Sequence, residues 1–160
     1  MPDTADLQMI VYAACDEDRA RILDVLGEGE MTSDWGSGST PTSLDLGHCY
    51  GKREAVLGAN AELVDNLRAA APTAVFEAWQ DPYGSTGGEY VAHVPGIGTY
   101  TADCDGAGEP YIHAGVLTRT LSESPEGTTI AEWLSGAGRD VLGTVVRAAL
   151  KAHKDALAVV

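Results

Sequence analysis

Residues 73–113 constrain the possible fold more than any other part of this sequence. Within TAVFEAWQDPYGSTGGEYVAHVPGIGTYTADCDGAGEPYIH, runs of β-branched and aromatic residues alternate with clusters of Gly, Pro and Asp. This pattern is typical of short strands joined by turns, because Gly and Pro favour turn geometry while branched side chains fit a pleated sheet. The predicted strands cover residues 73–80, 89–94, 99–104 and 110–113. Strands so close in sequence pair with their neighbours, so an antiparallel meander is expected.

The flanking segments supply further strands and helices. Residues 7–14 form an apolar run of strand length, and Asp16 is the predicted N-cap of the helix that follows. Thr129 and Glu132 fit a capping box at the start of a later helix. The additional predicted elements are strands over 7–14 and 44–50 and helices over 16–26, 53–71, 129–135 and 139–157.

Together these elements predict a single α+β domain over residues 1–160, a length that suits one hydrophobic core. We expect an antiparallel meander sheet of about four to five strands with helices packed on one face. A ferredoxin-like or related two-layer sandwich would satisfy this arrangement. Residues 28–43 are rich in Gly, Ser and Thr and are predicted to form a mobile loop, while residues 129–157 form the C-terminal helices.

The charge of the chain is strongly negative and unevenly placed. The formal net charge is −14; residues 1–138 hold 22 acidic and 6 basic residues, whereas residues 139–160 hold 2 acidic and 4 basic ones. A field of this sign repels phosphates, so direct nucleic-acid binding is not expected. A basic protein partner is electrostatically favoured. The alternative is that the acidity only keeps the protein soluble.

Cysteine usage and hydropathy point to a cytoplasmic protein. Cys15, Cys49 and Cys104 are far apart and form no CxxC pair, which fits a reducing compartment better than a disulfide framework. No basic segment followed by an apolar run resembles a signal peptide, and no stretch approaches the ~20 apolar residues of a membrane span. No cofactor is predicted, because the chain shows no phosphate-binding loop and no paired zinc ligands.

The hairpin over 89–104 carries the candidate catalytic residues. If Pro95–Gly98 is the connection, His93 pairs with Tyr100, and alternation places Glu89, His93, Tyr100 and Cys104 on one face. A Cys–His nucleophile pair formed by Cys104 with His93 or His113 would need a hydrogen bond and a third, orienting group. The alternatives are a half-polar sheet face, with Glu89 and Tyr100 as binding residues, and an inert buried thiol. Glu77 is a further ionisable residue of this stretch, with no assigned role.

The turn after this hairpin partly matches a calcium loop. Asp103 and Asp105 occupy the first and third ligand positions, and Glu109 follows, but Ala107 and Ala114 stand where two main ligands belong. The alternative is a hairpin turn in which the carboxylates accept backbone N–H groups.

The loop over 28–43 carries the candidate binding residues Trp35 and Asp34. An aromatic side chain on an irregular loop is a frequent anchor for a partner. The alternative is that Trp35 packs on the core.

Three functional hypotheses follow. The first is an acidic, non-enzymatic interaction module of the inhibitor, immunity or nucleic-acid-mimic type that binds a basic protein. The second is a small enzyme or metal-binding domain with its site on residues 89–113. The third is a structural or assembly subunit that uses the terminal helix; the sequence leaves the oligomeric state open.

Overall fold

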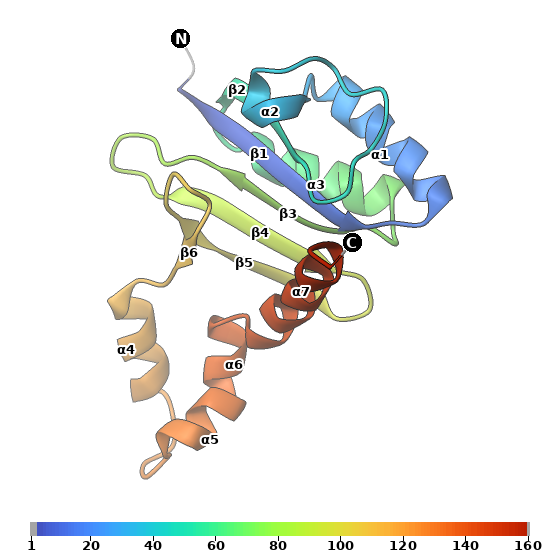
Figure 1. Ribbon diagram of the computed structural model, residues 1–160. Coiled ribbons are helices and arrows are strands. Elements are labelled where there is room, and N and C mark those ends of the chain that lie inside the picture. Colours follow the sequence, from blue (N-terminus) through green and yellow to red (C-terminus); the bar gives the residue numbers. More distant parts are fainter. Residues whose placement is uncertain (1–2, 160) are drawn as a thin grey trace.

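The computed structural model describes residues 3–159, which form an α+β fold around an open six-stranded antiparallel sheet (Figure 1). The strands are β1 (Thr4–Ala13), β2 (Cys49–Val56), β3 (Val75–Gln80), β4 (Gly88–Val94), β5 (Gly98–Cys104) and β6 (Pro110–Tyr111). The helices are α1 (Asp16–Glu28), α2 (Ser33–Gly36), α3 (Ala59–Ala70), α4 (Ala114–Ser122), α5 (Ile130–Ser135), α6 (Ala137–Val141) and α7 (Thr144–Leu157). None of the helices in this part of the chain combines the length and apolarity that crossing a bilayer requires.

The sheet has the order β2-β1-β3-β4-β5-β6. The meander β3-β4-β5-β6 confirms the antiparallel prediction, although the sheet holds six strands rather than four to five. The first strand, β1, pairs with β2 on one side and with β3 on the other. The connection through α3 therefore crosses over β1 and leaves β2 and β3 parallel to each other. A ferredoxin-like arrangement is not confirmed.

Helices cover both faces of the sheet, so the prediction of helices on one face is wrong. Helices α1 and α3 pack on one face, where Ile22 and Leu67 meet Met9 and Phe76 in the larger core. Helix α7 packs on the other face through Val146 and Leu150, at i and i+4 on its apolar side. All six residues of β3 are buried, as expected for a strand covered on both sides. Helices α4–α6 extend beyond the sheet between β6 and α7 (Figure 1).

Several element boundaries differ from the predictions. The second strand begins at Cys49 rather than at residue 44, and α3 begins at Ala59 because residues 53–56 extend β2. Helix α4 was not predicted. Asp16 lies inside α1, whose N-cap is Cys15 with no capping side chain. The capping box of α5 is confirmed.

The predicted helix over 139–157 is divided at Gly143. This residue has φ 60°, in the left-handed region, and a Cβ there would lie 2.2 Å from the Tyr100 ring. Only glycine permits both the turn and the close approach. The break lets α7 lie across the sheet while α6 leads away from it.

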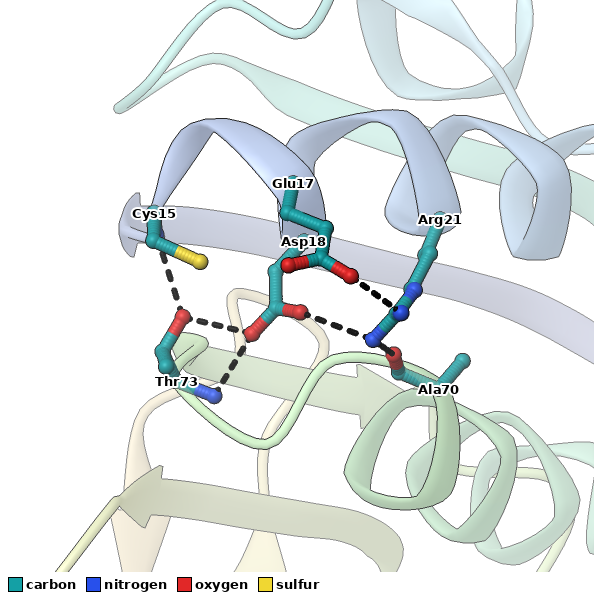
Figure 2. Close-up of polar contacts among 6 residues, drawn as sticks. All are labelled: Cys15, Glu17, Asp18, Arg21, Ala70 and Thr73. Carbon is teal, nitrogen blue, oxygen red and sulfur yellow. Dashed lines mark hydrogen bonds and ion pairs between the residues drawn. The ribbon is translucent and has the colours of Figure 1, made fainter.

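A polar cluster joins the start of α1 to the connection between α3 and β3 (Figure 2). The buried Asp18 carboxylate accepts hydrogen bonds from the Thr73 N–H (2.8 Å) and hydroxyl (2.6 Å), and Arg21 lies 3.4 Å from its other oxygen. Arg21 also donates to the carbonyl of Ala70. The Thr73 hydrogen bonds are the main reason that the pKa of Asp18 lies below its usual value. The cluster is structural and lies apart from the cleft described below.

Candidate ligand-binding cleft

The β4–β5 hairpin has a different register from the predicted one. Residues Pro95–Ile97 form a three-residue loop and Val94 pairs with Gly98, so His93 lies opposite Thr99 and not opposite Tyr100. A shift of one residue moves one strand's side chains to the other face relative to its partner. The His93 ring packs beside Phe76 on the α1–α3 side and its Nδ1 lies 2.8 Å from the Thr99 hydroxyl.

The candidate catalytic residues stay apart. Cys104 is fully buried on the α7 side, opposite to the face of His93, and burial is the main cause that raises the pKa of its thiol to about 12. A thiol in that state supplies almost no thiolate. His113 Nε2 lies 2.7 Å from a carboxylate oxygen of Asp103, and both side chains are exposed. The structure therefore brings together no Cys–His pair from these residues.

The candidate metal ligands are engaged separately. One oxygen of Asp105 accepts the N–H groups of Ala107 and Glu109, each at 2.9 Å, which is the turn-capping alternative. Asp103 faces His113, and Glu109 faces Arg147. Within residues 3–159, no group of three or more His, Cys, Asp or Glu side chains could hold a metal ion.

The two predicted binding residues of the hairpin border a groove beside β5. Glu89 and Tyr100 line it together with Asp103 and His113, and its volume is about 550 Å³. Beyond the Asp103–His113 pair, the groove brings no ionisable groups within hydrogen-bonding distance of one another.

A larger cleft lies between the sheet and α7. Its volume is about 700 Å³, within the range of small-molecule sites. The floor comes from β1, β3 and β4, one wall from α7, and the remaining sides from Trp35 of α2 and the turn between β5 and β6.

A buried carboxylate, Glu77, forms the polar centre of the cleft. Its residue is only 7% exposed, and its two oxygens accept the hydroxyl groups of Tyr12 and Tyr90 (2.7 Å for Tyr90). The ammonium group of Lys154 lies 2.7 Å from the same carboxylate and 5.2 Å from the centre of the Tyr12 ring. These partners satisfy a charge that would otherwise be costly to bury.

The two phenols of this network act as fixed donors. Burial, followed by the negative charge of Glu77, raises the pKa of both Tyr12 and Tyr90 well above the ordinary value of a phenol. Both side chains therefore remain protonated across the physiological range and neither serves as a base. The same causes raise the pKa of the nearby Cys49 thiol to about 12. Both phenol hydroxyls already donate to Glu77.

Trp35 enters the cleft from a strained turn. Asp34 and Trp35 have φ 55° and 59°, and Gly36 continues the left-handed run. For a non-glycine residue this conformation costs roughly 1 kcal/mol or more. The turn packs so closely on β2 that a Cβ at Gly51 would lie 2.7 Å from the Gly36 nitrogen.

The result of this turn is a half-exposed indole over the cleft. Trp35 is 49% exposed, and its ring lies 5.6 Å from that of Trp79 in an edge-to-face arrangement. Local strain of this kind is concentrated at functional sites. The structure thus places the predicted binding residue Trp35 on the border of the cleft, while Asp34 lies outside it near His48.

Sequence reasoning did not assign Glu77, Tyr12 or Lys154 to a site. Glu77 was visible as a single acidic residue between apolar neighbours in a predicted strand, which is the pattern of a buried and therefore partnered charge. Its partners Tyr12 and Lys154 lie near opposite ends of the chain and meet it only in the folded structure.

Comparisons of the chain with models of protein families, with curated proteins and with solved structures find no match. The function proposed next rests on the geometry and chemistry of the cleft.

Proposed function

We propose that this protein is a non-enzymatic binding module that holds a small organic ligand in the cleft around Glu77. The observation that carries the proposal is the cleft itself, in which about 700 Å³ of space adjoins two tryptophans and a buried, fully partnered carboxylate. Small-molecule sites commonly combine apolar and aromatic walls with a few fixed polar groups.

The tryptophans supply the aromatic part of this site. Trp79 is 3% exposed, and its indole N–H has no hydrogen-bond acceptor among residues 3–159. A buried donor in that state gains a partner when a ligand brings an acceptor to it. Gly108 lies so close to the Trp79 ring that a Cβ there would be 2.6 Å from it, so the β5–β6 turn covers part of the indole. Trp35 borders the remaining space.

The proposal is tested by fragment binding to the ¹⁵N-labelled protein. Aromatic fragments should shift the indole N–H signals of Trp35 and Trp79 and leave that of Trp133, which lies in α5, unchanged. Trp35→Ala should weaken binding about tenfold or more, as for an aromatic anchor. Tyr83→Ala removes another partly exposed aromatic side chain outside the cleft and serves as the matched control. Equal affinities of Trp35→Ala and Tyr83→Ala for the fragments would refute the proposal.

A second candidate function is the binding of a basic protein. Of the 24 acidic residues only Asp18 and Glu77 are buried, so the acidity lies at the surface. At one end of the sheet Asp81 is close enough to Asp6 and Asp105 that, after burial, their charges raise the pKa of its carboxyl. A cationic partner would relieve this repulsion.

Titration with a poly-lysine peptide tests this candidate. Association should weaken with added salt, and Asp81→Asn should weaken it more than Glu126→Gln, which removes an exposed charge elsewhere. Association that is insensitive to salt, or equally affected by both substitutions, would exclude this end of the sheet as the interface.

A further inference from the structure

We infer that the ligand of the Glu77 cleft is a monoanion that carries one carboxylate beside an aromatic ring, and that Arg147 is the residue that binds the carboxylate. This inference rests on the proposed function and specifies its ligand. It is derived from the charges and the unused hydrogen-bond donors of the cleft.

The cleft is locally more positive than the rest of the protein. Arg147, Lys151 and Lys154 follow one another on α7 at intervals of four and three residues and all border the cleft. The bordering acids are Glu77 and Glu109. Three cations thus face two bordering anions, with Asp155 beside Lys151 as a third acidic neighbour, so the charges around the cleft balance in a chain whose formal net charge is −14. A small anion that reaches the cleft meets three basic side chains on one helix.

Two hydrogen-bond donors on residues that line the cleft have no acceptor among residues 3–159. Glu77 already accepts from two phenols and faces Lys154, and Lys151 donates to Asp155. Arg147 lies 3.7 Å from Glu109, too far for a hydrogen bond, and its guanidinium makes none with any other residue between 3 and 159. The buried N–H of Trp79, a residue that lines the cleft, also lacks an acceptor among residues 3–159, and it lies beneath the turn at Gly108. A ligand with acceptors completes this arrangement, whereas a cationic ligand would compete with Lys154 for Glu77 or with Arg147 for Glu109.

A carboxylate suits these donors better than a phosphate does. The planar guanidinium presents paired N–H groups whose spacing matches the two oxygens of a carboxylate. Arg147 is 43% exposed, so its side chain can turn toward a ligand without leaving a buried charge behind. The negative field of the whole protein opposes each added negative charge, and a dianionic phosphate therefore meets about twice the repulsion of a monoanion. The ring of the ligand would lie against Trp35 and Trp79.

The test uses matched probes on the full chain. A panel of benzoate, phenylacetate, indole-3-acetate and 2-naphthoate is titrated beside the corresponding amides and amines, with the Trp35 and Trp79 indole N–H signals as the reporter. We expect the carboxylates to bind about tenfold or more tightly than their amides. The amines should bind most weakly.

Three variants assign the preference to Arg147. Arg147→Gln should lower the affinity ratio of carboxylate to amide to about one. Arg147→Lys should keep part of it, because the charge remains but the paired geometry is lost. Arg139→Gln, which removes an exposed arginine of α6 outside the cleft, should leave the ratio unchanged.

The outcomes separate this inference from the proposed function. If amides bind in the cleft as tightly as carboxylates, or if Arg147→Gln keeps the preference, the inference is overturned while the binding function stands. Tighter binding of the amines would overturn it as well. If no probe shifts the two indole signals, both the inference and the proposed function are refuted.

Discussion

Replacement of Glu77 by Gln tests the buried network at the centre of the cleft. The substitution keeps the shape of the side chain but turns charged acceptors for Tyr12 and Tyr90 into a neutral amide. Hydrogen bonds to charged groups contribute roughly 1.5–3 kcal/mol and neutral ones roughly 0.5–1.5, so the phenol that faces the amide oxygen loses about 1 kcal/mol. The other phenol faces the amide NH2, which donates and cannot accept, so its O–H loses its acceptor at a cost of about 1–2 kcal/mol. The pair with Lys154 adds less than about 1 kcal/mol, because that side chain is 40% exposed and can turn to solvent.

We therefore expect Glu77→Gln to lower the free energy of unfolding by about 2–3 kcal/mol. For a chain of this size that corresponds to a decrease in Tm of roughly 4–12 °C. Glu126→Gln, which removes an exposed acidic residue in the α4–α5 loop, corrects for the change in net charge. Urea unfolding followed by circular dichroism measures both variants. Equal free energies of unfolding for Glu77→Gln and Glu126→Gln would show that the hydrogen bonds from Tyr12 and Tyr90 to the carboxylate do not stabilise the fold.

Three further substitutions have expected signs that follow from the structure. Asp18→Asn should lower the free energy of unfolding at neutral pH, as measured by urea titration against the Glu126→Gln reference. Because folding lowers the pKa of Asp18, this difference in stability should disappear as pH falls below about 3.8 and through the folded-state pKa. Asp81→Asn should raise Tm at neutral pH, because the raised pKa of Asp81 shows that its ionised form is unfavourable in the folded protein. The gain in Tm should vanish at a pH where Asp81 is protonated. A gain that persists below pH 3.8 would show that it does not come from removal of the charge. Gly143→Ala should cost about 2–4 kcal/mol, because a left-handed conformation and a clash with an aromatic ring combine. Gly127 also has a positive φ, but a Cβ there would lie in open space. In chemical denaturation Gly127→Ala should therefore show only the cost of the left-handed conformation and no cost of a clash.

Local sequence patterns predicted the two strands of the hairpin well. The geometry of the connecting loop explains why the predicted pairing of these strands was wrong. Residues 89–94 and 99–104 correspond closely to β4 and β5, because alternation and turn residues act over a few positions. The sequence Pro-Gly-Ile-Gly is compatible with a loop of three or four residues. The structure selects three, with Gly96 at φ 77°, and this single difference separates His93 from the face of Cys104.

Tertiary contacts account for what the sequence could not show. The periodicity of residues 139–157 is helical throughout, and only the contact of Gly143 with the Tyr100 ring reveals why the chain turns there. The same turn sends α7 to the face opposite α1 and α3. That face holds Glu77, so the cleft exists because the last helix returns over a strand formed much earlier in the chain. The aromatic anchor Trp35 could be proposed from its loop, but its contact with Trp79 could not.

The fold gathers basic residues from the last part of the sequence on one side of the cleft. Three of the four basic residues in segment 139–160, namely Arg147, Lys151 and Lys154, lie on α7 and line the cleft, while all acidic residues except Asp18 and Glu77 are at least partly exposed. The net charge therefore governs the approach of a ligand at long range, whereas the basic side chains of α7 act on a ligand inside the cleft. Binding of an aryl carboxylate in the cleft and binding of a basic protein to the acidic surface therefore predict opposite responses of the association rate to salt.

At low ionic strength of about 0.01 M the field of the whole protein extends roughly 30 Å and repels an approaching carboxylate; at about 0.15 M it extends roughly 8 Å. Association of an aryl carboxylate with the cleft should therefore accelerate as salt is added, whereas association of poly-lysine with the acidic surface should slow. Stopped-flow tryptophan fluorescence measures both rates. If the association rate of the carboxylate falls as salt is added, the positive charges of α7 govern encounter at long range, and the negative field of the whole protein does not.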